Sequence, residues 1–511
     1  MPSWLPGAML LIAAWEVAAR GLAGRYLLAG PVDVAVHAWA NAGLLSRAAA
    51  ITLENALWGL ILGNLAAVAL ALVALALPRL AGVVAGLALV VFCLPLVATA
   101  PILRVLFGPG PGPQITIAAL AVYYTTFIPL MVGLRAAPAS WFDLIRLYGR
   151  GGATALVQVR AMAALPYLVA GLQIAAPAAI LGAMIGEFTG ADRGLGVLVI
   201  RAMRGLDVTA TWTLATISAG VAMAAFAAVG ALGRRLTPDR PEVLLTPPPA
   251  TAAGPMARLA VGLLTVLAVL VLWWGAMELA GLNRFFAKRP DDVWRFLVTA
   301  PQAAAARATL GAAMAETLAW TLPGYVVGLA LGAGLAAALV LFPAAAGSVM
   351  PLAVALRSVP IVTTAPLIVL ALGRGAAGTM AIVAVMTSFP ALVACLQGLR
   401  QAPGQVLDVF AAYGARPWQR LVHARLPAML PAFFAAARML VPAAVLAVTV
   451  AEWLATGRGM GHLMALSAST SNYNMLWSAT ALLAAVSALG YAGVAAVERR
   501  VLARYAPEQV S

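Results

Sequence analysis

The sequence predicts an all-α integral membrane protein with about twelve transmembrane helices, arranged as two tandem parallel repeats of about six. Its composition is the first observation, because 63% of the 511 residues are hydrophobic and only 10% are charged. One or two soluble cores cannot bury that much apolar surface. The second observation is a series of apolar runs, such as 60–77, 118–134 and 261–279, close to the ~20 residues that span a bilayer as helix.

The third observation is an internal repeat, because adding 265 to a residue number carries one half of the chain onto the other. This offset pairs Thr52 with Thr317, Gly59 with Gly324, Gly63 with Gly328, Pro95 with Pro360, Pro101 with Pro366, Tyr148-Gly149 with Tyr413-Gly414, Pro166 with Pro431, Glu187 with Glu452 and Trp212 with Trp477. Upstream the offset is 259, which pairs Trp15 with Trp274, so copy two carries extra residues that we place at 303–308. Apolar bias alone does not align so many Pro, Gly and Glu residues.

The repeat divides the chain into copy one at 1–236, a linker at 237–257 and copy two at 258–511. Three prolines at 247–249 cannot continue a helix and favour an extended linker. The expected spans lie near 8–23, 55–77, 81–106, 115–135, 168–189 and 210–233, then near 258–280, 319–342, 348–372, 376–398, 433–455 and 476–497. An even number of spans gives both copies the same orientation.

The net charge of +15 comes from arginines scattered over short loops between the apolar runs. A membrane protein therefore explains the charge better than nucleic-acid binding does, and no nucleic-acid partner is expected. The loops show a weak positive-inside bias, which predicts that both termini are cytoplasmic. The two cysteines lie in apolar runs, and no metal-ligand spacing or nucleophile with a base occurs, so we expect no enzyme activity and no cofactor in this chain.

A polar loop of about thirty residues joins the fourth and fifth expected spans of each copy. Copy two reads Asp408, Tyr413-Gly414 and then Leu426-Pro427, and copy one reads Asp143, Tyr148-Gly149 and then Pro166. The pattern predicts a short amphipathic helix that ends at Gly, a turn, and a second short helix that ends at Pro. A helix pair of this kind at the membrane face is a surface that a soluble partner can bind.

This loop resembles the motif of ABC-importer permeases, in which an acidic residue and two small residues are followed by Gly and then by Ile-x-Leu-Pro. The segments Leu356-Arg357-Ser-Val-Pro360 and Gly457-Arg-Gly459-Met-Gly461 are similar to the nitrate, sulfonate and taurine subgroup. The resemblance covers both copies and implies two permease domains of the type I importer fold, fused in one chain. Copy one departs from the motif, because it has Ala161-Met162 where copy two has Leu426-Pro427. This difference puts in doubt that the two halves couple equally to the partner ATPase of such importers.

The resemblance implies a function in alternating access within a bacterial inner membrane. Two copies of an ABC ATPase, which carry the ATP and Mg, would bind the loops, and a periplasmic or lipid-anchored solute-binding protein would deliver a small solute such as a sulfonate or nitrate. The ATPase is not in this chain, since a P-loop needs Gly-Lys-Ser/Thr and the sole lysine, Lys288, follows Ala287. We expect the binding protein to dock on the basic segment 284–307 and on the loops after Glu187 and Glu452.

Several residues within the spans are candidates for the translocation path or its gate: Glu187, Glu452, Arg357, Pro95, Pro101, Pro360 and Pro366. Each also has a structural interpretation. The glutamates could reach the interface or pair with Arg193 and Arg458, Arg357 could reach lipid phosphate, and the prolines could only kink helices. Trp212 and Trp477 are expected to be interfacial anchors.

The alternative function is an ion-coupled secondary transporter, which can also consist of two parallel six-helix repeats. Such a carrier should have a charged loop between spans two and three, whereas this chain has only Leu77-Pro78-Arg79-Leu80 there. Its long loop should also join the two halves, not the spans within each half. The sequence therefore favours the importer permease.

Overall fold

The computed structural model describes residues 5–22, 24, 28–237, 255–343, 365, 368–369 and 371–505. These residues form helices joined by turns, and no strand occurs among them, which confirms the all-α fold. Most of the expected linker, most of the span expected near 348–372, and the candidates Arg357, Pro360 and Pro366 lie outside the described residues.

The same order of helices occurs in both copies. Copy one contains α1 (Leu5–Gly21), α2 (Pro31–Ala40), α3 (Ala42–Ala76), η1 (Pro78–Leu80), α4 (Ala81–Phe92), α5 (Leu96–Phe107), α6 (Gly112–Arg135), α7 (Ala139–Leu147), α8 (Gly152–Thr154), η2 (Ala155–Ala161), α9 (Met162–Phe188), α10 (Leu195–Arg204) and α11 (Val208–Leu236). Copy two contains α12 (Pro255–Leu279), α13 (Pro290–Trp294), η3 (Arg295–Thr299), α14 (Ala303–Leu341), α17 (Ala376–Arg400), α18 (Gly404–Ala412), α19 (Pro417–Arg420), η4 (Leu421–Arg425), α20 (Leu426–Ala451), η5 (Glu452–Thr456), α21 (Gly459–Ser469) and α22 (Tyr473–Tyr505). The repeat in the sequence is therefore a repeat in the fold.

Nine helices in the described part of the chain are long and apolar enough to cross a membrane, and a bent pair could form a tenth span. The first helix, α1, has 17 residues. The peripheral helix α12 buries only 6% of its most apolar window, whereas the corresponding windows of α6 and of the helix ending at Leu454 bury 61%. The apolar surface of α12 therefore faces lipid, which the composition predicted.

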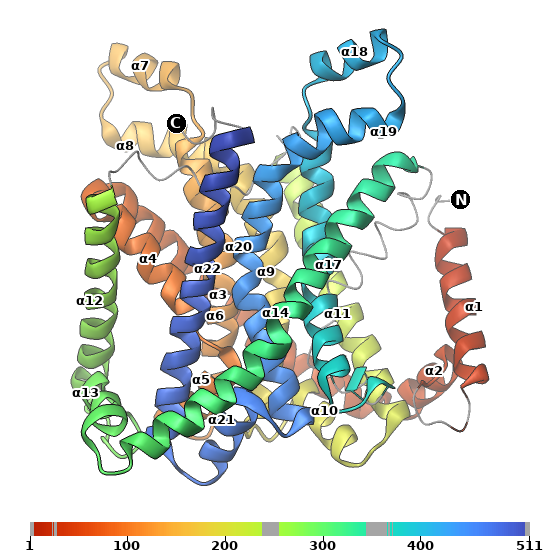
Figure 1. Cartoon of the computed structure of the whole chain (residues 1–511), viewed down its shortest axis with the longest axis vertical. Coiled ribbons are helices and arrows are strands. Elements are labelled where there is room, and N and C mark those ends of the chain that lie inside the picture. Colours follow the sequence, from red (N-terminus) through yellow and green to blue (C-terminus); the bar gives the residue numbers. More distant parts are fainter. Residues whose placement is uncertain are drawn as a thin grey trace.

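Both copies cross the bundle in the same direction. The short helices α7 and α18 project from one face, which we call the loop face, while α10, α13 and α21 lie at the opposite face (Figure 1). Helix α1 begins on the side of the loop face and α22 ends there (Figure 1). This arrangement confirms the parallel repeat and places both ends of the described chain on the same side as the two polar loops.

Glycines that recur in the repeat let long helices approach closely. On α3, a Cβ atom added at Gly59 would lie 2.2 Å from Ala118 of α6, and one added at Gly63 would lie 2.7 Å from the Ala119 carbonyl. On α14, a Cβ at Gly328 would lie 1.9 Å from Thr387 of α17. Small residues four apart are a usual means of helix packing in lipid, where apolar burial alone gives little driving force between helices.

The third span of copy one is broken where the sequence places Pro95. Helices α4 and α5 meet at a bend of 89°, and Pro95 is the N-cap of α5. A proline removes a backbone donor and clashes with the preceding turn, so the helix is interrupted. Pro101, in contrast, does not interrupt the span, because it lies inside α5, which continues to Phe107.

The first helix of copy two packs on copy one. A Cβ at Gly86 of α4 would lie 2.6 Å from the Thr265 hydroxyl of α12, and one at Gly82 would lie 3.1 Å from Val261. Helix α12, at the periphery of copy two, therefore packs directly against α4 of copy one. Trp15 donates to the Ala29 carbonyl at 3.0 Å, and in copy two it is Trp273 that makes the matching bond, to the Lys288 carbonyl at 3.0 Å. The structural equivalent of Trp15 is therefore Trp273, so the pairing of Trp15 with Trp274 is off by one residue.

This contact predicts that the two copies stay together when the chain is cut between residues 246 and 247. The substitution Gly86→Leu should weaken that association, because overpacking of this kind costs about 1–3 kcal/mol. Co-purification of copy two with affinity-tagged copy one measures the effect. Gly262→Leu on α12 is the matched control, because a Cβ there meets no atom within 4 Å. If both variants retain equally less of copy two, the contact between α4 and α12 does not hold the copies together.

Candidate functional site

A central cavity of about 280 Å³ lies between the two copies. Its wall is mostly apolar, with Thr125, Gln397 and Gln401 as the polar members among the described residues. The lining residues come from α4, α6 and α9 of copy one and from α17 and α20 of copy two, with Gln401 just after α17: Phe92, Thr125, Ile128, Pro129, Ile174, Pro390, Val393, Ala394, Gln397, Gln401, Ala432, Ala435, Ala436, Met439, Leu440 and Ala443.

The axis that relates the two copies passes through this cavity. With the offset of 265, four pairs of equivalent positions face it from opposite walls: Thr125 and Pro390, Ile128 and Val393, Pro129 and Ala394, Ile174 and Met439. A site on the axis is shared equally by both halves, as the binding sites of repeat-built transporters are. These residues were not predicted, although their spacing of three and four along α6 and α17 marks one helix face.

An apolar cluster closes the space between the copies on the side of the opposite face. It combines Leu96, Val97 and Ile117 of copy one with Ile382 and Val448 of copy two. Helix α6 runs from Gly112 to Arg135, and Ile117 precedes the cavity residue Ile128 by about 16 Å of helix rise. The cavity therefore lies nearer to the loop face, and the closure lies nearer to the opposite face.

Neither Pro95 nor Pro101, the two candidate prolines in the described part of the chain, lies in the wall of the cavity. Pro95 is buried at the α4–α5 break, three residues after Phe92, which does line the cavity and stacks on Tyr124 with ring centroids 4.3 Å apart. Pro101 lies further along α5. The proline break therefore positions Phe92. The predicted roles of Arg357, Pro360 and Pro366 stay predictions, since these residues lie outside the described part.

Glu187 is a buried carboxylate that joins three helices of copy one. It lies at the end of α9 with 1% of its surface exposed, and its Oε1 accepts a hydrogen bond of 2.8 Å from the Thr52 hydroxyl of α3. Its Oε2 accepts a bond of 2.7 Å from the Gly196 backbone N–H in the first turn of α10. Thr52 in turn accepts the Leu195 N–H at 2.9 Å. A helix N-terminus offers free N–H groups to an anion, so a buried carboxylate is stabilised there.

Copy two repeats this arrangement around Glu452. The Thr317 hydroxyl donates to its carboxylate at 2.8 Å, and the Gly461 N–H donates at 2.8 Å. A Cβ at Gly459 would lie 2.1 Å from Glu452, which explains the glycine that follows the arginine. Both glutamates are buried, and within the described chain neither forms an ion pair with Arg193 or Arg458, as the alternative interpretation had it. Neither is among the residues that line the central cavity. A role in gating stays a prediction.

The two polar loops form matching helix pairs at the loop face (Figure 1). Tyr148 is the C-cap of α7 and Tyr413 is the C-cap of α18, and the following Gly149 and Gly414 have φ of 63° and 68°. In each loop an N–H just beyond the glycine bonds back five residues, from Arg150 to Ile145 and from Ala415 to Phe410. This is a Schellman-type ending, for which glycine is favoured.

The projecting helices expose apolar side chains. Tyr148 and Tyr413 are 75% and 88% exposed. Asp143 and Asp408 are also exposed, and Asp143 forms an ion pair of 3.2 Å with Arg146. Exposed apolar groups beyond the membrane-spanning helices are typical of surfaces that another protein covers.

The expectation that Pro166 and Pro431 end the second short helix is wrong. Both prolines lie inside the long helices α9 and α20, and Pro427 is the second residue of α20. The π-helical turns η2 and η4 come directly before these helices. Prolines inside membrane-spanning helices are tolerated because neighbouring groups and local π adjustments satisfy the freed backbone groups, so the chain continues into the span. Leu426 and Pro427 are half-buried at this junction.

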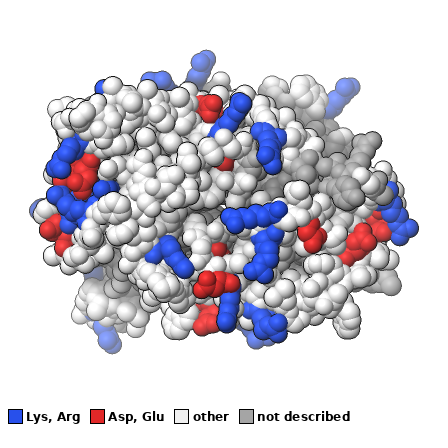
Figure 2. All heavy atoms as spheres, turned by 90° about the horizontal axis from the view of Figure 1, so that it is seen from below, with Lys and Arg blue, Asp and Glu red and all other residues white. Residues whose placement is uncertain are grey.

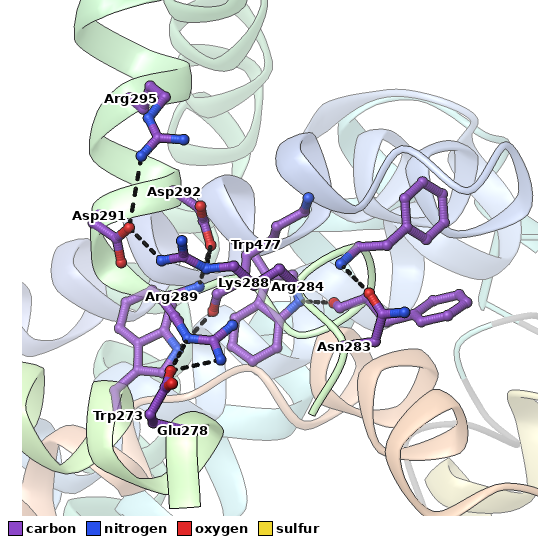
Figure 3. Close-up of polar contacts among 12 residues, drawn as sticks. Trp273, Glu278, Asn283, Arg284, Lys288, Arg289, Asp291, Asp292, Arg295 and Trp477 are labelled. Carbon is purple, nitrogen blue, oxygen red and sulfur yellow. Dashed lines mark hydrogen bonds and ion pairs between the residues drawn. The ribbon is translucent and has the colours of Figure 1, made fainter. Parts of the chain in front are cut away.

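Arginines of the basic segment 284–307 form ion pairs with nearby carboxylates. Arg284 contacts Asp291 at 2.6 Å, and Arg289 contacts Glu278 at 2.7 Å (Figure 3). Partial burial lowers the pKa of Lys288 below its usual value. On the opposite face, Lys and Arg side chains lie near the centre as well as at the edges (Figure 2).

Trp477 lies close to this segment (Figure 3). It stacks on Trp273 with ring centroids 5.5 Å apart and donates to the Phe286 carbonyl at 2.8 Å. Only 9% of its surface is exposed. Its expected role as an anchor in the lipid interface is therefore wrong, since it fastens α22 to the loop between α12 and α13.

The fold and the cavity on its axis define a membrane permease built from two equivalent halves. A family model described as "Binding-protein-dependent transport system inner membrane component" matches twice, at residues 51–238 and 328–503, which together exceed half of the chain. The chain belongs to this family, the permeases of ABC importers, with two permease domains in one polypeptide.

Similar proteins are single permeases that match part of this chain. A probable ABC transporter permease protein of Haemophilus influenzae is 32% identical over 208 residues, which cover 40% of this chain and 84% of the relative. The formylaminopyrimidine transport permease of Halalkalibacterium halodurans is 28% identical, over 30% of this chain and 62% of the relative. The putative aliphatic sulfonates transport permease of Bacillus subtilis is 25% identical, over 29% of this chain and 53% of the relative.

The carboxylate joint predicts that Thr52→Val destabilises copy one. Valine keeps the shape of threonine but removes the donor to Glu187 and the acceptor for Leu195, and a buried polar group left without its partner costs about 1–3 kcal/mol. Thermal unfolding of the purified protein in detergent measures the loss. Thr216→Val is the control, because that exposed hydroxyl bonds only within its own helix; an equal shift there would mean that the joint contributes nothing.

Proposed function

We propose that this chain forms the whole translocation path of an ABC importer for a small solute. The observation that carries the proposal is the central cavity on the axis between two equivalent halves, closed by apolar contacts on one side and flanked by projecting helix pairs on the other. In this proposal two ATPase subunits bind the loop face, and a solute-binding protein, periplasmic or lipid-anchored, docks on the opposite face. ATP and Mg belong to the ATPase subunits, and this chain catalyses no reaction.

The loop face is the cytoplasmic side in this proposal. Both ends of the described chain lie toward that side together with α7 and α18 (Figure 1). The weak excess of Lys and Arg in the loops expected on that side agrees with a cytoplasmic location. The residues proposed to couple to the ATPase are Asp143, Tyr148, Gly149, Pro166, Asp408, Tyr413, Gly414, Leu426 and Pro427.

Movement of the two halves would open the path in turn to each side. With the cavity nearer to the loop face and the apolar cluster nearer to the opposite face, the arrangement corresponds to a path open toward the cytoplasm. Closure of the ATPase pair would bring α7 and α18 together and separate the apolar cluster. Rigid-body rocking of repeats around a fixed site is the usual means of alternating access.

The solute is a small nutrient in this proposal, and a sulfonate or nitrate remains the expectation from the sequence. The similar permeases are named for a formylaminopyrimidine and for aliphatic sulfonates, so their names do not select one class. The cavity wall is mainly apolar, and Thr125, Gln397 and Gln401 supply uncharged polar groups that can hydrogen-bond a small solute.

A bulky residue at the end of a projecting helix should release the ATPase. Leucine at Gly149 or Gly414 must adopt a positive φ, which costs about 1–2 kcal/mol, so the end of α7 or α18 and its exposed tyrosine would move. We expect the amount of P-loop ATPase that co-purifies with the tagged chain to fall about tenfold, the factor that corresponds to ~1.4 kcal/mol. Comparing the two single variants shows whether the halves couple equally.

Gly404→Leu is the control for this experiment. Gly404 lies in α18 of the same loop, has no positive φ, and a Cβ there meets no atom within 4 Å. Loss of the ATPase from this variant as well would mean that any change in the loop disturbs the complex. If no ATPase co-purifies with the unmodified chain and uptake follows an ion gradient, the secondary-transporter function replaces this proposal.

A further inference from the structure

A second pocket, of about 330 Å³, lies in copy two beyond the apolar cluster. Helix α14, the start of α17 and the turn between η5 and α21 form its wall. Its polar and aromatic members are Glu316, Trp320, Arg374, Thr379, Glu452, Thr456 and Arg458. Two residues of the pocket wall are close in sequence to members of the apolar cluster. Thr379 is three residues from Ile382 on α17, and Glu452 directly follows Ala451. The pocket therefore lies just outside the closure of the central cavity.

The two carboxylates of this pocket are in different states. Glu452 is 2% exposed and its two oxygens are used by Thr317 and Gly461. Glu316 is exposed, and its Oε2 accepts the Gly459 N–H at 3.0 Å. Its Oε1 has no hydrogen bond within the described chain. One carboxylate oxygen is thus free to receive a donor from a ligand.

The two arginines of the pocket are exposed, and neither has an acidic partner among the described residues. Neither Arg374 nor Arg458 forms an ion pair with any residue in the described ranges, although both share the pocket with Glu316. The arginines of the segment 284–295, in contrast, are engaged by Asp291, Asp292 and Glu278 (Figure 3). Guanidinium groups that are free and face a cavity are suited to bind an oxyanion by paired N–H donors.

This combination of charges occurs in copy two only. The offset of 265 places Ile51 at the position of Glu316, Asn55 at that of Trp320 and Pro109 at that of Arg374. The glutamate joint itself is the same in both copies, so the scaffold does not require the additional charges. Charges that only one of two equivalent scaffolds carries are candidates for a function that only this copy performs.

We propose that this pocket binds a zwitterionic group, with an oxyanion between Arg374 and Arg458 and an ammonium at Glu316 and the indole face of Trp320. The four charged side chains of the pocket sum to zero, so a ligand with both charges keeps the site neutral. An ammonium over an indole gains cation–π attraction, and a charge-assisted hydrogen bond is about twice as strong as a neutral one. The proposal rests on the proposed function, because it gives the outer end of the path a site for a charged solute.

Two sources can supply this chemistry. A free amino acid or aminosulfonate carries one oxyanion and one ammonium, and so does the headgroup of phosphatidylethanolamine. The pocket lies at the ends of membrane-spanning helices, at a depth that a lipid headgroup also reaches. The test must therefore separate a soluble ligand from a lipid.

The experiment uses the full-length chain in nanodiscs of phosphatidylglycerol and calorimetric titration with taurine, β-alanine, methanesulfonate, propionate and ethylamine. We expect taurine or β-alanine to bind about tenfold more tightly than the probes that lack one of the two charges. Arg374→Gln and Arg458→Gln should each weaken zwitterion binding about tenfold. Glu316→Gln keeps an acceptor for the Gly459 N–H, and it should remove the preference for taurine over methanesulfonate.

Controls and a lipid arm complete the test. Arg193→Gln, at the equivalent position in copy one, and Arg284→Gln should leave binding unchanged. The lipid arm repeats the titration in nanodiscs that contain phosphatidylethanolamine. If this lipid suppresses taurine binding to the unmodified chain but does not reduce the residual binding to the Glu316→Gln variant, the site is supported and the lipid is its occupant. Equal binding of methanesulfonate and taurine, no binding of any probe, or equal loss in Arg284→Gln would overturn the proposal. Co-purification of the ATPase is independent of all these outcomes, so the two proposals fail separately.

Discussion

A buried carboxylate at the end of the fifth span holds each copy together, and the other helices of the copy are arranged around it. An ionisable group among apolar helices is costly unless donors surround it. Glu187 and Glu452 obtain theirs from a threonine hydroxyl on one long helix and from a backbone N–H at the start of a short one. This requirement explains the glycines that follow each glutamate, because a side chain at Gly194 or Gly459 would occupy the space of the carboxylate. Three helices are thereby fixed relative to one another.

The sequence was sufficient for the fold class, the parallel repeat and the two projecting loops, since each of these depends on patterns along the chain. It was insufficient where neighbours in space decide. The carboxylate partners Thr52 and Thr317 were seen as a repeated pair, but nothing along the chain shows that they lie 2.8 Å from the glutamates. Pro166 looked like a helix end because a proline normally stops a helix, but α9 continues through both Pro166 and Pro177. Trp477 looked like a lipid anchor because its stacking partner Trp273 is 204 residues away.

The two copies share a scaffold but differ in the side chains they add to it. Copy two carries an ion pair of 2.9 Å between Arg438 and Glu498, where copy one has Gln173 and Gly233. It also has the charged pocket at Glu316 and Arg374, where copy one has Ile51 and Pro109. Fusion of two permease domains in one chain allows this, because each half can then change without imposing the same change on the other. A symmetric pair of identical subunits would have to accept every substitution twice.

The kinds of contact inside and between the copies differ in a way that favours motion between them. Inside a copy, the carboxylate joint depends on hydrogen bonds whose loss leaves buried polar groups unpaired, so this joint resists distortion. Around the axis, the cluster that closes the path consists of Leu96, Val97, Ile117, Ile382 and Val448 and their neighbours, which have no directional bonds to break. Apolar surfaces can separate and meet again in more than one register, at a cost that depends on the area exposed. A force applied at α7 and α18 is therefore expected to move each half as a rigid body and to open the structure at the axis, where the cavity lies.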